Sequence, residues 1–192
     1  MSTENFWEQR YKNNGNSGAG SYGELCNFKT SIINSFIKDT NTNRIIDFGC
    51  GDGNQLKGLK IPSYLGVDIS ETAINKCKLI FSNDKTKKFV KYSEMNFDMG
   101  KYDVSMSLDV IYHILEYNLY EKYLSNLFTS TKEFVVIYSS DFDKKPSGHV
   151  HHRKFTDYVQ KHFTEFKMIK HIPQIHPNIS CADFFIYQKQ NN

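Results

Sequence analysis

The chain has 192 residues, a length that suits one domain with a substantial hydrophobic core. Its 24 basic and 21 acidic residues leave a net charge of +3, which is too small to indicate a nucleic-acid partner. No segment has the roughly 18 consecutive apolar residues that suggest a membrane span, and the polar start lacks the apolar core of a signal peptide.

The cysteines bear on location and on metal binding. They are far apart and form no Cys-x-x-Cys pair, at Cys26, Cys50, Cys77 and Cys181. This usage is typical of reduced thiols in the cytosol rather than of a disulfide framework or a metal knuckle. We therefore expect a cytoplasmic protein without a metal site. The sequence does not indicate an oligomeric state.

Helical and strand patterns alternate along the chain. Helices are expected at 5–12, 25–38, after the glycines up to about 62, 71–80, 117–129 and 155–163. Strands are expected at 44–48, 63–68, 89–92, 103–108, 134–139, 166–171 and 184–188. This order predicts an α/β fold with seven strands in a mostly parallel sheet and helices on both faces. The short connection between the last two strands suits an antiparallel hairpin at the sheet edge.

Residues 44–54 are the most informative stretch. A short strand ends in Asp47 and is followed by alternating glycines at Gly49, Gly51 and Gly53. Without a Cβ, such a turn lets backbone come within contact distance of a ligand. The spacing is Gly-x-Gly-x-Gly, and Asn54 stands where the dinucleotide fingerprint has its third glycine. The turn favours a nucleoside-type ligand and matches a dinucleotide only imperfectly.

A second carboxylate completes this pattern. Asp68 ends the next predicted strand, 19 residues after Gly49, which is close to the spacing of the acid that holds ribose hydroxyls. The alternative is that Asp47 and Asp68 merely cap a helix or a turn. Because strand, turn, helix, strand and acid come in order, we favour the ligand site.

These residues resemble the class I S-adenosylmethionine-dependent methyltransferases over roughly residues 5–190. In that family the first strand ends in an acid followed by Gly-x-Gly-x-Gly, here Asp47 with the three glycines, and the second strand ends in the ribose-binding acid, here Asp68. The stretch 103–113 resembles the family's fourth strand and the segment into which it leads. The opening, at Trp7–Tyr11 and Gly15–Gly23, is similar to that of small bacterial members linked to capsule, surface-polysaccharide or small-metabolite modification. The resemblance implies a Rossmann-like fold and S-adenosylmethionine as cofactor.

The resemblance also implies roles for individual residues. Asp47 would lie near the cofactor's ammonium group, Asp68 would accept from the ribose hydroxyls, and Ile69 would press on the adenine. Glu94, Met95 or Asn96 would border the adenine, with the choice left open. The full set of implied cofactor contacts is Trp7, Arg10, Tyr11, Asp47, Gly49, Gly51, Asp68, Ile69, Asn96 and Leu108.

His113 is the candidate general base, because it follows the fourth strand within one turn and an unperturbed imidazole titrates near neutrality. Tyr112 and Asp109 are weaker candidates beside it. The alternative is a histidine at a helix start that only bonds a neighbour. Methyl transfer otherwise needs mainly alignment of the acceptor with the methyl group.

The N-terminal segment suggests a lid. Its glycines make residues 13–23 flexible, while Trp7, Arg10, Tyr11 and Tyr22 can grip a ligand, and Arg10 suits the cofactor's carboxylate. A disordered terminus is the alternative. We expect one domain over 1–192, with a helical and lid segment at 1–40 and a Rossmann-like core at 41–192.

A histidine-rich segment follows the fifth predicted strand. His149, His151 and Arg153 offer several donors, which suits recognition of a phosphate or carboxylate on the acceptor, with Tyr22 on the lid. Zinc is a weaker interpretation, because neither cysteine nor carboxylate stands at ligand spacing. A solvated basic loop is the third possibility.

Together these features predict transfer of a methyl group to a small-molecule acceptor. An oxygen on a phosphorylated or saccharide-pathway metabolite is expected, including a capsule phosphoramidate precursor. Neither nucleic acid nor membrane is an expected partner. A nicotinamide-dependent oxidoreductase and a non-catalytic nucleoside-binding module remain open alternatives.

Overall fold

The computed structural model describes residues 1–96, 101–144 and 146–190. They group into two compact units, one before and one after residues 97–100.

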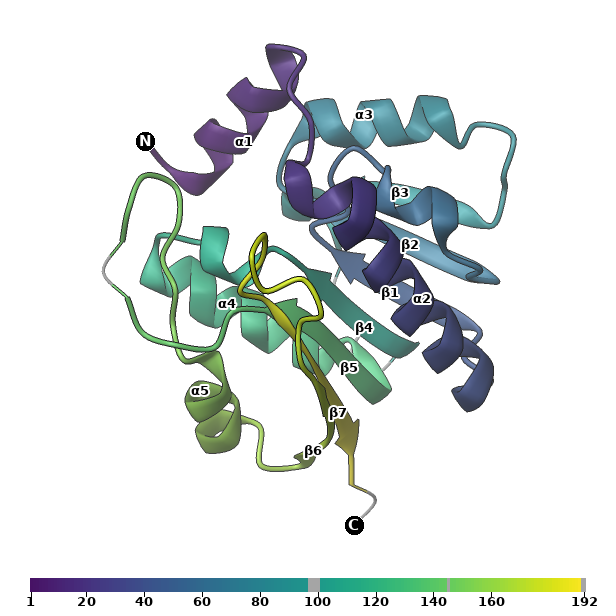
Figure 1. Ribbon diagram of the computed structural model, residues 1–192. Helices are drawn as coiled ribbons and strands as arrows, with labels where there is room; N and C mark the ends of the chain where they lie inside the picture. Colours follow the sequence, from purple (N-terminus) through teal and green to yellow (C-terminus); the bar gives the residue numbers. More distant parts are fainter. Residues whose placement is uncertain (97–100, 145, 191–192) are drawn as a thin grey trace. The chain divides into compact units, whose positions relative to one another are not determined.

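Helices and strands alternate through the first unit (Figure 1). Its elements are α1 (Thr3–Lys12), η1 (Ala19–Ser21), α2 (Gly23–Thr40), β1 (Arg44–Phe48), η2 (Gln55–Gly58), β2 (Ser63–Asp68), α3 (Glu71–Ile80), β3 (Lys87–Lys91) and η3 (Tyr92–Glu94). The second unit contains β4 (Tyr102–Leu108), η4 (Ile111–His113), α4 (Tyr117–Thr129), β5 (Thr131–Ser139), α5 (Phe155–His162), β6 (Phe166–Ile172) and β7 (Asp183–Lys189).

The predicted fold class is confirmed. The strands form a seven-stranded sheet in the order β3-β2-β1-β4-β5-β7-β6, with helices around it. β1 and β3 run parallel to β2, and β4 runs parallel to β5. β7 is antiparallel to both β5 and β6, so the last two strands form the expected antiparallel edge. This is a Rossmann-like methyltransferase fold.

In the first unit, burial on both faces explains the apolar β1, whose last four residues are all buried. α3 packs on β2 and β3, and α1 lies alongside α3 (Figure 1). Ser70 begins α3 as its N-cap, since its hydroxyl accepts from the Ala73 N–H at 3.1 Å. The carboxyl end of β2 thus passes directly into a helix N-terminus.

In the second unit, α4 packs on β4 and β5. Its buried side chains lie on one face of the helix, at Tyr120, Tyr123, Leu124, Leu127 and Phe128. Phe128 stacks on Phe163 with a centroid separation of 4.3 Å and meets Phe166 edge-on at 5.0 Å. The high aromatic content of the sequence therefore forms much of this core.

Several elements differ from their predicted bounds by one or two residues, and two differ by more. β5 begins three residues before Phe134, because Thr131 is buried and its hydroxyl donates to the Asp103 carbonyl at 2.8 Å. The helix expected after the glycines is only the short η2. In the described part of the chain, no helix has both the length and the apolarity needed to cross a bilayer.

Candidate functional site

The glycine turn after β1 has the backbone form that its sequence predicted. Gly49, Gly51 and Gly53 have φ values of 88°, 56° and 76°, in the region that disfavours side chains. The Gly49 N–H donates to the Val67 carbonyl at 2.7 Å, which ties the turn to the end of β2. A Cβ on Gly51 would collide with the Ser17 hydroxyl. Glycine is therefore needed at position 51 because another part of the chain, at Ser17, packs directly against it.

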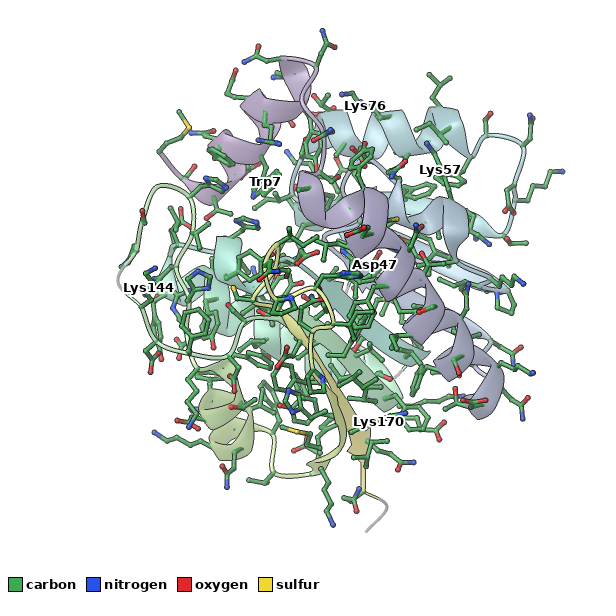
Figure 2. All side chains as sticks on the ribbon, in the orientation of Figure 1. Trp7, Asp47, Lys57, Lys76, Lys144 and Lys170 are labelled. Atoms are coloured by element: carbon green, nitrogen blue, oxygen red, sulfur yellow. The ribbon has the colours of Figure 1, made fainter. Side chains whose placement is uncertain are left out.

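Asp47, labelled in Figure 2, has a buried carboxylate of which one oxygen accepts no hydrogen bond from the described residues. Oδ2 accepts a hydrogen bond of 2.7 Å from the Tyr64 hydroxyl. Oδ1 is buried and accepts none from any residue that the structure describes. Burial raises the pKa of Asp47 to about 7, although the Tyr64 hydrogen bond and the charge of Lys29 lower it. An orphaned buried oxygen of this kind fits a ligand that brings a donor.

Asp68 holds the turn and the start of α3 together. Its Oδ2 accepts from the Gly51 N–H at 2.9 Å, and its Oδ1 accepts from the Ser70 N–H at 2.8 Å. Burial raises the pKa of Asp68 to about 6, against the lowering effect of the backbone N–H groups of Ser70, Gly51 and Ile69. Ile69 follows it and is half-buried. Each carboxylate oxygen keeps a second lone pair, so Asp68 can still accept from ribose hydroxyls.

Residues 11–22, here called the strap, are bound to the tip of the glycine turn. The Asp52 Oδ2 accepts from the Ser17 N–H at 2.9 Å and from the Tyr22 hydroxyl at 2.8 Å. In return, the Asp52 N–H donates to the Ser17 hydroxyl oxygen at 2.9 Å. The Asn54 amide donates to the Ser21 carbonyl at 2.7 Å. The segment predicted as a lid is thus ordered, and Tyr22 uses its hydroxyl within the protein.

α1 is anchored beside α3 by an acid. The Glu8 carboxylate accepts from the Ser70 hydroxyl at 2.6 Å and from the Thr72 hydroxyl at 2.8 Å. Partial burial alone raises the pKa of Glu8, but these hydrogen bonds outweigh it and bring the pKa to about 2. The Lys76 ammonium donates to the Tyr11 carbonyl at 3.1 Å, with Lys76 on α3 and Trp7 on α1 labelled in Figure 2.

Three expected cofactor contacts have protein partners within α1 and the strap. The Arg10 guanidinium donates to the Asn16 carbonyl at 2.6 Å and lies 5.8 Å from the Trp7 ring centroid. The Tyr11 hydroxyl shares a hydrogen bond of 2.9 Å with Ser17. Burial, first, and the charge of Asp68 raise the pKa of Tyr11, so its phenol stays protonated.

The remaining expected cofactor contacts lie in different units. Asn96 follows η3 in the first unit and is exposed. Leu108 is the last residue of β4 in the second unit and is buried.

In the second unit, a strained residue follows β4. Asp109 has a φ of 60°, which is uncommon for a residue with a side chain. Its Oδ1 accepts from the Tyr112 hydroxyl at 2.7 Å. Burial, with the neighbouring Asp109 charge, raises the pKa of Tyr112 far above its usual range. Tyr112 is therefore a hydrogen-bond donor at physiological pH rather than a base.

His113 ends η4 and contacts His149. Its Nδ1 lies 3.1 Å from the His149 carbonyl oxygen, and the two rings stack at 5.0 Å with an interplanar angle of 12°. A carbonyl only accepts, so the neutral ring carries its proton on Nδ1 and Nε2 is the basic nitrogen. This is the tautomer that a general base acting through Nε2 requires.

The segment after His149 is bound to the protein through its side chains. Arg153 donates to the carbonyls of Ile114 and Leu115 at 2.7 and 3.0 Å. His152 Nδ1 shares a hydrogen bond of 2.6 Å with the Ser140 hydroxyl. Burial, first, and the charge of Arg153 lower the pKa of His151. Arg153 thus holds the backbone of Ile114 and Leu115 in place. An anion bound as predicted would have to use the other N–H groups of Arg153.

Among residues 1–96, 101–144 and 146–190, no group of three or more histidine, cysteine, aspartate or glutamate side chains could hold a metal ion.

A family model matches most of the chain, at residues 23–177, and describes a methyltransferase domain. The chain belongs to the methyltransferase domain family. The predicted enzyme class and cofactor, an S-adenosylmethionine-dependent methyltransferase, are confirmed. The nicotinamide-dependent oxidoreductase is thereby set aside. No curated protein matches this methyltransferase in sequence.

Solved structures share the methyltransferase fold at low identity. Magnesium protoporphyrin IX methyltransferase from Synechocystis, with bound SAM, has a TM-score of 0.69 and 14% identity over 99% of this chain and 98% of that chain. Burkholderia thailandensis 1,6-didemethyltoxoflavin-N1-methyltransferase has a TM-score of 0.72 and 12% identity over 98% and 87%. CurJ carbon methyltransferase has a TM-score of 0.66 and 12% identity over 84% of this chain, which spans only 54% of that protein.

The sequence pattern did not single out several residues of this candidate site. They are Glu8, Ser17, Asp52 and Tyr64, all of which act through contacts with distant parts of the chain. Only Asp52 carried a signal, as an acid between Gly51 and Gly53 at the tip of the turn.

Proposed function

We propose that this methyltransferase transfers the methyl group of S-adenosylmethionine to an oxygen of a small acceptor, with His113 as general base. The observation that carries the cofactor site is the glycine turn between two buried carboxylates, Asp47 and Asp68. When bound, S-adenosylmethionine supplies a methyl group on a sulfonium cation, which a nucleophile displaces directly.

The residues of the first unit fit this cofactor. The orphaned Oδ1 of Asp47 suits an ammonium donor, and Asp68 has lone pairs for two ribose hydroxyls. Gly49 and Gly51 bring no side chain of their own to the turn, and Ile69 would offer an apolar face to adenine. Contacts from Asn96 and the Leu108 carbonyl, and from Trp7, Arg10 and Tyr11, complete the proposed set.

His113 would take the proton that an acceptor hydroxyl loses. Its contact with His149 fixes the tautomer, which leaves Nε2 as the proton acceptor. A positioned base contributes roughly 10²–10⁴-fold in rate, and alignment of the reactants contributes about 7–11 kcal/mol. Tyr112, whose hydroxyl proton is donated to Asp109, would orient the acceptor by accepting a hydrogen bond from it.

The acceptor class is a finer proposal. His149 and His151 would provide donors for a phosphorylated or saccharide-pathway metabolite such as a capsule phosphoramidate precursor. Tyr22 remains part of this proposal, although its hydroxyl proton is donated to Asp52 in the structure. The engagement of Arg153 with two backbone carbonyls reduces the support for tight phosphate binding. Activity on matched phosphorylated and unphosphorylated acceptors tests this point, and equal rates would reject it.

The strap is proposed as a lid over the bound cofactor. The chain is proposed to be a single domain, with a helical and lid segment at 1–40 and a core at 41–192, in a cytoplasmic protein. Its hydrogen bonds with the glycine turn support that role. A lid that excludes water protects a sulfonium reaction from hydrolysis.

The experiment that tests the function has two steps. Calorimetry should show binding of S-adenosylhomocysteine and none of NAD. Incubation with S-adenosylmethionine carrying a labelled methyl group and a metabolite extract should then transfer label to a small molecule. Binding without any transfer would instead favour a nucleoside-binding module.

A further inference from the structure

We propose that Tyr64 is a positioning residue of the cofactor site, which holds Asp47 so that Oδ1 accepts from the ammonium group of the cofactor. Nothing in the sequence pattern assigned Tyr64 a role. The inference rests on the proposed use of Asp47 and adds the residue through which that carboxylate is aimed.

The geometry of β1 and β2 brings the two side chains together. Ile45 pairs with Tyr64 and Asp47 with Gly66 in the parallel register, so Tyr64 lies two residues upstream of the strand position beside Asp47. Its hydroxyl reaches Asp47 Oδ2 at 2.7 Å while the ring remains only 2% exposed. One carboxylate oxygen is thereby committed to the protein.

Gly66 provides the space that this arrangement needs. A Cβ at Gly66 would lie 2.8 Å from the Phe89 ring, 2.9 Å from the Tyr64 ring and 2.9 Å from the Cys50 sulfur. Contacts that short do not occur between real side chains, so alanine there would displace at least one of these three groups. The glycine within β2 therefore leaves the space that the Tyr64 ring and its two neighbours occupy.

Oδ1 is the oxygen that remains for a ligand. It is buried, and no described residue donates to it, Lys29 included. A buried carboxylate oxygen without a donor is costly, so a ligand that brings an N–H group to this position gains from the pairing. An ammonium supplies both the donor and the opposite charge.

The charges around Asp47 make the pairing dependent on pH. The groups of the first unit that act on it are Tyr64, Lys29, Asp68 and Cys50. Burial brings the pKa of Asp47 to about 7, and the Tyr64 hydrogen bond lowers it. Because an ammonium pairs with the ionised form, binding near neutral pH releases a proton from Asp47. Loss of the Tyr64 hydroxyl raises the pKa and moves this release to higher pH.

The test uses two ligands that differ at the amino acid end. S-adenosylhomocysteine carries the ammonium group, whereas 5′-methylthioadenosine has the same adenosine without it. Calorimetric titrations in two buffers of different ionisation enthalpy, between pH 6 and 9, give the affinity and the number of protons released. Proton release that is coupled to Asp68 appears with both ligands and is removed by comparison.

For Tyr64→Phe we expect about tenfold weaker binding of S-adenosylhomocysteine at pH 7, since a hydrogen bond to a charged group is lost. Proton release should shift to higher pH, and 5′-methylthioadenosine should bind as in the wild type. Asp47→Asn should release no proton through this site. Tyr187→Phe is the matched control, because it removes a buried strand hydroxyl that has no hydrogen-bond partner among the described residues.

Equal weakening of both ligands by Tyr64→Phe would overturn the inference, since it would show only a structural effect. An unchanged affinity and an unchanged proton-release profile would also overturn it. Failure of the wild type to bind S-adenosylhomocysteine would instead reject the proposed cofactor function, so the two failures are distinguishable.

Discussion

The glycine turn of the first unit differs from the histidine-rich segment of the second, residues 149–153. The difference lies in whether their polar side chains are already hydrogen-bonded within the protein. In the turn, Asp47 keeps a buried oxygen without a hydrogen bond from any described residue. In the histidine-rich segment, Arg153 and His152 already bond to carbonyl and hydroxyl groups of the chain. The first region retains an acceptor oxygen that no described residue uses, while the second is held in shape by its own side chains.

The strongest test of this difference between the two regions is a substitution of Asp68. We expect Asp68→Asn to raise the Kd for S-adenosylhomocysteine by about 100-fold or more, because two charge-assisted hydrogen bonds from ribose are weakened. Calorimetry measures the change. The matched control is Asp39→Asn on α2, an exposed acid of the same unit, which should bind normally. An affinity within about threefold of wild type in Asp68→Asn would place the nucleoside elsewhere.

His113 tests the second region. His113→Ala should lower turnover by roughly 10²–10⁴-fold, because the proton of the acceptor loses its base. The Kd for S-adenosylhomocysteine should stay unchanged. Single-turnover kinetics with labelled cofactor measure the loss, and His162→Ala on α5 is the control. Unchanged turnover would remove His113 from the mechanism.

A smaller effect is expected where the strap meets the turn. Asp52→Asn keeps one acceptor oxygen but weakens the hydrogen bonds from Ser17 and Tyr22. We expect about tenfold faster dissociation of S-adenosylhomocysteine and faster proteolysis within residues 13–22. Stopped-flow and limited proteolysis measure the two rates. Asp39→Asn again serves as the control, and wild-type rates in Asp52→Asn would show that the strap has no gating role.

The smallest effect is expected at Glu8. Its hydrogen bonds with Ser70 and Thr72 hold the folded-state pKa near 2, below the ordinary value of 4.5. A depressed pKa contributes stability above the unfolded value, and that stability is lost as pH falls from 4.5 towards 2. Glu8→Gln should therefore lower the free energy of unfolding by about 1 kcal/mol at pH 7.

Urea unfolding at several pH values measures the Glu8 effect. The difference between Glu8→Gln and wild type should shrink steadily below pH 4.5. A difference that stays constant down to about pH 3 would show that ionisation of Glu8 does not anchor α1.

Local sequence predicted much of the fold. The bounds expected for β2, α3 and α4 are those observed, because each is marked by its own periodicity and, for α3, by the Ser70 cap. Asp47, Asp68 and the glycines were recognisable for the same reason. A strand end, a tight turn and a helix start are set by neighbours in the chain.

Other parts of the site depend on strand pairing and on packing. The Tyr64–Asp47 hydrogen bond joins residues 17 positions apart, and the Ser17–Asp52 pair joins residues 35 positions apart. Arg153 was expected to meet an anion, yet its partners here are carbonyls 39 and 38 residues away. A linear pattern does not show which side chains will be used up by such contacts.

The sequence by itself determined the order of elements, the glycine turn and the two acids that flank it, because backbone conformation and short-range spacing encode them. The tertiary structure alone decided which oxygen of Asp47 remains for a ligand and which nitrogen of His113 is basic. Those choices depend on hydrogen bonds between distant segments, which form only when the strands and loops have come together.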